Sequence, residues 1–277
     1  MAPKQIVPIF SGGGTRLLAH IGILKALQDL DVSFKSIVGI SGGSIVASLH
    51  SYGMTNKALY DLAVNTDFRQ FRDFSILRLL RYGGLSSGIK FEQWMDKQLD
   101  GMTFSDAPIP LHLLATDVNG GGPVIFSKET SPNMKVSHAV RCSMSIPLLF
   151  SYQVYEQHLL VDGAILSEDA LFRDWQQDGT PNICFRLRSE AREQPFNPKR
   201  RFMLPQYIGM LIRTFMTALS REYVHAEHWH NTLVINTGAA SSVDFDMSRE
   251  DKLALFTQGY ETAMNFLPGK LERANLA

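Results

Sequence analysis

The chain has 277 residues, of which 45% are hydrophobic, with 27 basic and 27 acidic side chains. This length is enough for one large α/β core, and the balanced charge argues against a nucleic-acid-binding protein, which normally carries a basic surplus. The two cysteines are too few for a disulfide framework and lack metal-like spacing, which indicates a reducing compartment. No apolar run is long enough to predict a membrane-spanning helix.

The N-terminal third alternates short apolar runs with glycine-rich turns and helix-like segments. Residues 6–10 predict a buried strand, and residues 16–30 predict a helix because their apolar side chains recur at helical spacing. Residues 36–40 predict a second strand and residues 44–52 a short helix. The segment 55–101 is mostly helical in pattern and mixes arginine with aromatic side chains.

The rest of the chain continues the alternation. Further strands are predicted at residues 111–117, 123–127, 153–155, 158–161, 183–187 and 233–236. Further helices are predicted at residues 137–144, 202–225 and 248–266, and residues 189–205, rich in proline and charge, predict a loop. This order predicts an α/β sandwich with a largely parallel sheet.

Two glycine-rich turns lie fewer than thirty residues apart, each between a predicted strand and a predicted helix. The second reads Gly39-Ile40-Ser41-Gly42-Gly43, and a serine flanked by glycines at such a junction is the pattern of a nucleophile elbow. The start of the following helix favours developing negative charge. The same pattern also occurs by chance in turns without chemistry, so alone it leaves both interpretations open.

The first turn contains Gly12, Gly13 and Gly14. It lacks the last glycine of a dinucleotide-binding fingerprint, since Leu17 stands there, and it lacks the Gly-Lys-Ser/Thr of a phosphate loop. The nearby serine favours an oxyanion hole, in which backbone N–H groups stabilise a tetrahedral acyl intermediate. Arg16 has two open interpretations: a surface or salt-bridged residue near a helix start, or a residue that supports the loop or contacts a lipid phosphate.

Two kinds of general base fit the candidate nucleophile. His225, His228 and His230 follow in the chain order of a Ser-Asp-His triad, but they lie on a helix-like segment. Asp162 is the stronger candidate because it follows an apolar strand and precedes Gly163, which places its carboxylate at a strand end. A partly desolvated aspartate accepts a proton once its pKa rises, although Asp-Gly is also an ordinary turn pair.

The ordered set of motifs resembles the patatin-like phospholipase family. The family motifs G-G-G-x-[KR]-G, G-x-S-x-G and D-G-[AG] match the first glycine turn with Arg16, the Ser41 elbow and Asp162-Gly163-Ala164. The resemblance covers about residues 5–170 and extends to the stretches 20–27 and 143–147. It implies a patatin-like three-layer sandwich with helices on both faces of the sheet. Residues 1–277 would form a single domain, with residues 171–277 as its C-terminal part.

The resemblance also implies an activity and its residues. It implies a serine lipid acyl hydrolase of phospholipase A or lysophospholipase type, with Ser41 as nucleophile and Asp162 as base in a dyad without histidine. The oxyanion hole would come from Gly12, Gly13, Gly14 and Gly42, and the motifs would be supported by Arg16, Gly39, Gly43, Gly163 and Ala164. No metal or cofactor is implied. Two alternatives stay open: a lipid acyltransferase on the same dyad, and a catalytically silent lipid-binding module.

The sequence departs from the family pattern at two places. Leu17 replaces the last glycine of the first motif, which bears on the packing of the following helix. Glu168 and Ala170 stand where many members have asparagine and proline, which bears on the support of the aspartate loop.

Two segments predict contact with a lipid surface. Residues 69–81 interleave arginine with large apolar side chains, and the basic run 199–201 precedes a helix rich in methionine and phenylalanine. Each also fits a core-facing apolar stripe with a solvated face. We expect a cytoplasmic enzyme that acts on a lipid or phospholipid and associates peripherally with a membrane surface. The oligomeric state and the lipid head group are left open by the sequence.

Overall fold

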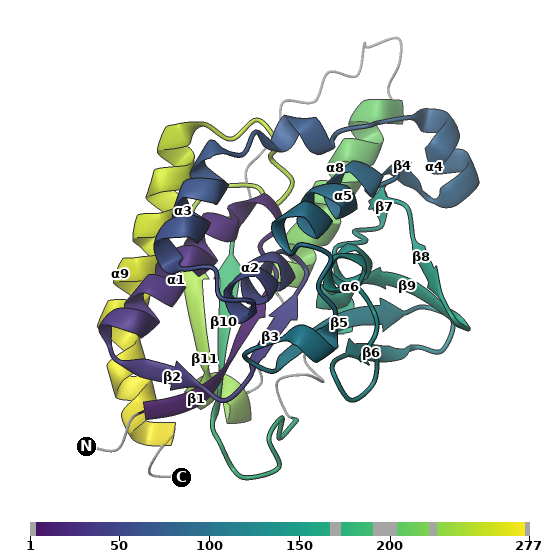
Figure 1. Ribbon diagram of the computed structural model, residues 1–277. Coiled ribbons are helices and arrows are strands. Elements are labelled where there is room, and N and C mark those ends of the chain that lie inside the picture. Colours follow the sequence, from purple (N-terminus) through teal and green to yellow (C-terminus); the bar gives the residue numbers. More distant parts are fainter. Residues whose placement is uncertain (1–3, 167–172, 191–203, 222–225, 275–277) are drawn as a thin grey trace.

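The computed structural model of the protein describes residues 4–166, 173–190, 204–221 and 226–274 (Figure 1). Within these residues a nine-stranded sheet has the order β11-β10-β1-β3-β5-β9-β8, with β2 beside β1 and β6 beside β5. The strands of this sheet are β1 (Lys4–Ser11), β2 (Val32–Phe34), β3 (Ile37–Ile40), β5 (Leu111–Asp117), β6 (Gly122–Phe126), β8 (Gln153–Tyr155), β9 (His158–Asp162), β10 (Asn182–Arg188) and β11 (Thr232–Asn236). A separate two-stranded sheet pairs β4 (Gly84–Ser86) with β7 (Leu148–Phe150).

The helices connect these strands and cover the sheet. The α-helices are α1 (Leu17–Asp29), α2 (Gly42–Ser51), α3 (Asn56–Asn65), α4 (Ile76–Tyr82), α5 (Ile89–Gln98), α6 (Val136–Ser143), α8 (Leu204–Arg221) and α9 (Arg249–Ala274). Short 3-10 turns are η1 (Gly14–Arg16), η2 (Phe68–Phe71), η3 (Phe104–Asp106), η4 (Gly163–Leu166) and η5 (Ala226–Asn231).

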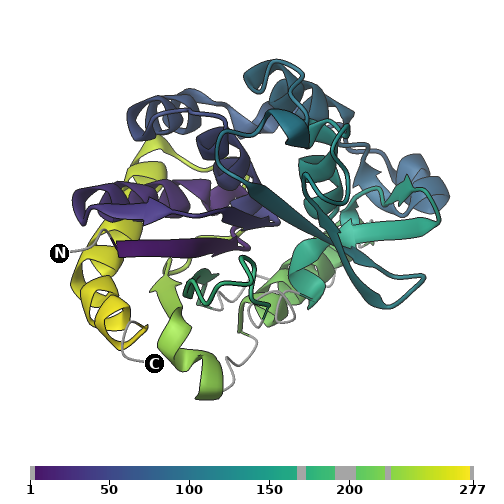
Figure 2. The ribbon, with the colours of Figure 1, turned by 60° about the horizontal axis from the view of Figure 1, so that its bottom comes forward.

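The sheet is mostly parallel and is covered on both faces. β11, β10, β1, β3 and β5 run parallel, whereas β6 and β9 pair antiparallel with β5. The larger core lies on the face covered by α1, α2, α3, α6 and α9. The other face packs against η4, the segment around Trp175 and α8 (Figure 2). The expected α/β sandwich is therefore confirmed, and the fully buried β3 explains why its sequence is a continuous apolar run.

The strand register brings three distant segments to one edge of the sheet. Ser11 at the end of β1 pairs with Ile40 at the end of β3, so the two glycine-rich turns lie side by side. Ile40 pairs in turn with Leu114 on β5, and the next β5 residue, Ala115, pairs with Asp162. The carboxyl ends of parallel strands form the usual site edge of such folds.

The structure differs from the sequence predictions in several places. The three-residue strands β2, β4 and β7 were not predicted. The segment 69–81 is not one amphipathic helix, because the buried Phe68 and Phe71 fix the turn η2 in the core and α4 begins only after the cap at Ser75. The residues Glu168, Ala170, 199–201 and His225 lie outside the described residues. In the described part of the chain no helix combines the length and the apolar character needed to cross a bilayer.

Candidate active site

The backbone at Ser41 forms a sharp turn between β3 and α2. Ser41 has φ 52° and ψ −130°, a conformation rarely adopted by residues with a side chain, and it occupies the N-cap position of α2 without a side-chain capping hydrogen bond. The turn is possible because its neighbours are glycines: a Cβ at Gly43 would collide with the Phe10 carbonyl, and one at Gly39 would lie 2.6 Å from Ser44 Cα. The predicted elbow is therefore present in the geometry.

Ser41 and Asp162 meet at this edge. The Ser41 hydroxyl donates a 2.7 Å hydrogen bond to Asp162 Oδ2, and the Ala164 N–H donates a 2.8 Å hydrogen bond to Oδ1. Neither Ser41 nor Asp162 has any exposed surface. Burial raises the pKa of Asp162 to about 7, while the hydrogen bonds from Ser41 and Ala164 act in the opposite direction. Gly163 lets the chain pass against the Leu114 carbonyl, where a Cβ would not fit.

The first glycine turn lies beside the elbow. Gly12, Gly13 and Gly14 all have positive φ, and a Cβ at Gly42 would collide with the backbone of Gly14. The Gly12 N–H donates to the Ile40 carbonyl at 3.0 Å and so links the first glycine turn to the end of β3. Because this N–H is already hydrogen-bonded, Gly12 is not available as one of the expected oxyanion donors. Among the described residues no partner is found for the N–H groups of Gly13 and Gly14, and Gly42 stands at the first position of α2, where an N–H has no intrahelical partner.

Two buried side chains hold the carbonyl groups of this turn. Arg16 Nε donates to the Gly13 carbonyl at 3.2 Å, and Arg16 Nη1 donates to Thr237 Oγ1 at 2.7 Å. His20 Nε2 lies 3.1 Å from the Gly12 carbonyl. Arg16 is only 2% exposed, which rules out the surface interpretation and agrees with support of the loop. Burial lowers the pKa of His20 to about 4, so its imidazole is neutral near pH 7 and donates from Nε2.

Three neighbours of the dyad were not identified from sequence. Ser143 Oγ accepts the Ser41 N–H at 2.9 Å, and the Asp162 N–H donates to the Ser145 carbonyl at 3.0 Å. The Met144 thioether lies 3.8 Å from Ser41 Oγ. The sequence signal for all three is the stretch 143–147, which belongs to the family resemblance.

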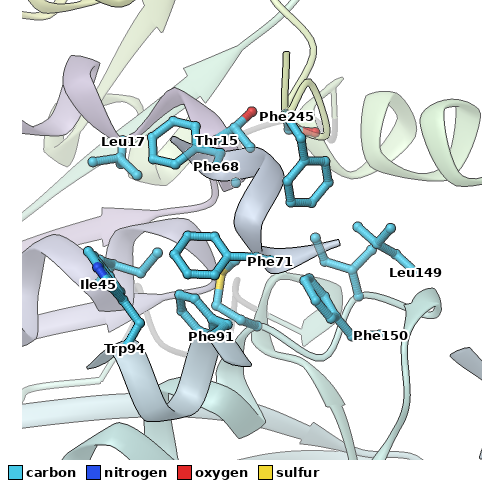
Figure 3. A pocket seen from close by; sticks show the side chains of 14 residues that line it. Thr15, Leu17, Ile45, Phe68, Phe71, Phe91, Trp94, Leu149, Phe150 and Phe245 are labelled. Carbon is cyan, nitrogen blue, oxygen red and sulfur yellow. The ribbon is translucent and has the colours of Figure 1, made fainter. Parts of the chain in front are cut away.

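An apolar pocket, here called the inner pocket, adjoins the dyad. It is lined by Gly14 and Met144 on the dyad side, and Figure 3 shows the rings of Phe71, Phe91 and Phe245 directed into it. Leu17 also lines the inner pocket and is 7% exposed, so the residue that departs from the family glycine forms part of an apolar wall. The pocket has a volume of about 40 Å³.

The candidate histidines lie away from the dyad. His228 and His230 belong to η5, which precedes β11 and therefore lies at the amino edge of the parallel strands, opposite Ser41 (Figure 1). Among the described residues no histidine hydrogen-bonds Ser41 or Asp162. The described residues also contain no group of three or more His, Cys, Asp or Glu side chains placed to hold a metal ion.

Comparison with solved structures shows the same fold in two bacterial proteins. VipD of Legionella pneumophila superposes with a TM-score of 0.63 at 16% identity, covering 95% of this chain and 67% of that chain. The type III effector ExoU of Pseudomonas aeruginosa superposes with a TM-score of 0.57 at 16% identity, covering 100% of this chain and 54% of that chain.

Comparison of sequences gives relatives that match nearly the whole chain and relatives that match only part of it. The uncharacterised protein YqhO of Bacillus subtilis is 27% identical over 284 residues, which cover 94% of this chain and 97% of YqhO. The neuropathy target esterase sws of Drosophila grimshawi is 28% identical over 165 residues, which cover 57% of this chain and 11% of that protein. The family model described as "Patatin-like phospholipase" matches residues 9–171, a range that contains both glycine turns, Ser41 and Asp162. The chain therefore belongs to the patatin-like phospholipase family, a family of lipid hydrolases.

Proposed function

We propose that this protein hydrolyses carboxylic esters of lipids, with Ser41 as nucleophile and Asp162 as general base. The observation that carries the proposal is the 2.7 Å hydrogen bond from the Ser41 hydroxyl to the buried Asp162 carboxylate, at the edge where the glycine turns meet. A nucleophile within hydrogen-bond reach of a base that is held by a third group is the arrangement expected of covalent catalysis. Here the third group is the Ala164 N–H.

The proposed reaction has two stages, acylation of Ser41 and hydrolysis of the acyl-enzyme. Asp162 accepts the hydroxyl proton as Ser41 Oγ attacks the ester carbonyl, and the oxyanion of the tetrahedral intermediate lies near Gly13, Gly14 and Gly42. The protonated Asp162 then gives its proton to the leaving alcohol, which departs and leaves an acyl-enzyme. Asp162 then takes a proton from water as the water attacks the acyl-enzyme, and it returns this proton to Ser41 Oγ as the fatty acid is released. A free N–H aimed at the oxyanion is typically worth roughly 3–4 kcal/mol of barrier.

The proposal includes the C-terminal part of the chain and a lipid surface. β10 and β11 continue the sheet of the motif-bearing part, and α9 packs along α1, which supports one domain over residues 1–277. α4 has no buried residue, and its Leu77 and Leu80 are 75% and 78% exposed. Such an apolar surface beside arginine supports peripheral contact with a membrane.

Covalent labelling tests the nucleophile directly. A fluorophosphonate should add once to the parent protein, and digestion followed by mass spectrometry should place the adduct on Ser41. Ser41→Ala should abolish both labelling and ester hydrolysis. Ser48→Ala is the matched control, because Ser48 is a buried serine of the same helix whose hydroxyl has no partner among the described residues. An adduct on a different serine, with Ser41→Ala still active, would contradict the proposal.

A further inference from the structure

A second cavity, here called the outer cavity, lies between α4 and α8 and has no part in the mechanism above. Its volume is about 400 Å³, ten times that of the inner pocket. Leu149 and Phe245 line both cavities, so these two side chains stand between the inner pocket and the outer cavity. Met144, which lies 3.8 Å from Ser41 Oγ, lines the inner pocket, so the order outward from Ser41 is the inner pocket, this shared wall and the outer cavity.

The inner pocket is too small for the acyl chain of a membrane lipid. A cavity needs about 10–15 Å³ to hold one water molecule, so the 40 Å³ inner pocket has room for only a few water-sized groups. An acyl chain spans about 15 Å, half the hydrocarbon thickness of a bilayer. A long chain whose carbonyl lies at Ser41 must therefore extend beyond the inner pocket.

The lining of the outer cavity suits the distal part of such a chain. Its apolar lining includes Leu85, Leu149, Ile208, Ile212, Val243 and Phe245. The charged side chains at the cavity include Arg72 and Asp246, which form an ion pair with each other. Burying methylene groups against the apolar part is favourable, at about 0.8 kcal/mol for each group.

Of the two side chains that form the shared wall, Leu149 belongs to a paired strand and Phe245 belongs to a loop. Leu149 belongs to β7, which is paired with β4. Phe245 lies in the segment 237–248 between β11 and α9, outside any helix or strand, and it is only partly buried. Its ring contacts Phe74 and lies under the Arg72 guanidinium, and both of these residues line the outer cavity. A rotation of the Phe245 side chain would therefore change the wall between the two cavities without moving a helix or strand.

We propose that the outer cavity binds the distal part of a fatty acyl chain and that Leu149 and Phe245 form the gate between short-chain and long-chain binding. This inference rests on the proposed hydrolase function and adds the two side chains that determine the length of acyl chain the enzyme accepts. Short acyl esters use the inner pocket alone, whereas long chains need both cavities.

Gly209 offers a test that does not threaten the fold. It lines the outer cavity from α8, and a Cβ built on it meets no atom within 4 Å. Gly209→Trp therefore fills the cavity and also replaces a glycine inside a helix with a better helix former. Gly269→Trp is the matched control, because Gly269 is also inside a helix with open space at its Cβ but does not line either cavity.

The first measurement is hydrolysis of p-nitrophenyl butyrate and p-nitrophenyl palmitate. Gly209→Trp should lower kcat/KM for the palmitate ester at least tenfold and leave the butyrate ester within twofold, whereas Gly269→Trp should change neither. Phe245→Ala should raise the ratio of palmitate to butyrate hydrolysis. Equal palmitate hydrolysis by Gly209→Trp and the parent would overturn the inference.

The second measurement is independent of turnover. In a Ser41→Ala background, binding of palmitate measured by calorimetry should weaken at least tenfold on adding Gly209→Trp and stay unchanged on adding Gly269→Trp. If the parent hydrolyses neither ester and Ser41 takes no label, the hydrolase proposal fails, while palmitate binding still decides the role of the outer cavity. Unchanged palmitate binding in Gly209→Trp would exclude that role.

Discussion

Asp162 Oδ2 accepts a 2.7 Å hydrogen bond from the Ser41 hydroxyl, although the two residues are 121 positions apart in the sequence. Ser41 follows β3 and Asp162 ends β9, and β5 lies between these strands in the sheet. Both side chains are fully buried, so the carboxylate is desolvated and its pKa rises to about 7. A carboxyl group with a pKa near neutrality is suited to accepting a proton from serine and giving it to an alcohol.

Replacing Asp162 should separate the dyad from a histidine triad. Asp162→Asn keeps the shape of the side chain and an acceptor for the Ala164 N–H but removes the base, so kcat should fall by about 10²–10⁴-fold. His230→Ala, at the opposite edge of the sheet, should stay within twofold of the parent. Turnover on a soluble ester and circular dichroism check both variants, and a large loss in His230→Ala with an intact fold would argue for a triad.

The pH dependence of hydrolysis should report the ionisation of Asp162. The base must be deprotonated, and its pKa in the folded protein is about 7, so kcat/KM should rise from pH 5 and level off above about pH 8. The measurement is kcat/KM for p-nitrophenyl butyrate across this range, with the ester's spontaneous hydrolysis subtracted. A profile that is flat through pH 7, or one that falls, would be inconsistent with Asp162 as the base.

Ionisation of Asp162 should raise activity but lower the stability of the folded protein as the pH rises. The pKa of Asp162 is raised from 3.8 to about 7 on folding, so the folded state binds more protons than the unfolded state between these values. The stabilising contribution is complete below about pH 4 and is lost as the pH rises through 7. Asp162→Asn removes this dependence, so its stability relative to the parent should improve from pH 4.5 to pH 8. Urea unfolding at the two pH values measures the difference, and an unchanged difference would show that Asp162 is not desolvated.

The sequence predicts the structure best where a short local pattern determines both a strand and the turn that ends it. The apolar runs of β1, β3 and β5 predicted a parallel sheet, and the glycines at positions 39 and 43 predicted the elbow because only small residues fit there. Asp162 could be placed at a strand end from its neighbours alone. The strands β2, β4 and β7 were missed because three residues are too few to show an alternating pattern.

Contacts that depend on strand register could not be predicted from local patterns. The Gly12 N–H was expected to be an oxyanion donor, but the pairing of β1 with β3 brings it to the Ile40 carbonyl. Ser143 and Met144 reach Ser41 only because α6 ends beside β9. The buried state of Arg16 likewise depends on Thr237, more than two hundred residues away.

His20 should act as a positioning residue for the oxyanion hole. In a trans peptide the C=O and N–H groups point in opposite directions, so a hydrogen bond that holds the Gly12 carbonyl also aims the Gly13 N–H. His20→Phe keeps the ring but loses the donor, and kcat should fall on the order of a hundredfold with little change in KM, since one misaligned oxyanion donor costs about 10²–10³.

A conservative variant separates this role of His20 from a purely structural one. Glutamine carries an amide donor at a similar reach, so His20→Gln should recover much of kcat, and fluorophosphonate labelling should slow in His20→Phe but less in His20→Gln. Thermal unfolding of both variants provides the control for folding. Equal kcat in His20→Phe and the parent would show that the loop is held without this contact.

The exposed face of α4 should bind lipid. Leu77 and Leu80 are the two most exposed large apolar side chains among the described residues, and burying each in a bilayer should gain about 1.5–3 kcal/mol. The double variant Leu77→Ser and Leu80→Ser should therefore weaken binding to anionic vesicles at least tenfold while leaving hydrolysis of p-nitrophenyl butyrate unchanged. Phe266→Ser is the matched control, because Phe266 is 61% exposed on α9, far from α4 in Figure 1. Arg81, also exposed, adds an electrostatic part, so Arg81→Gln should weaken binding at low salt more than at high salt. Equal losses in the α4 double variant and in Phe266→Ser would show that this face of α4 is not the membrane-binding surface.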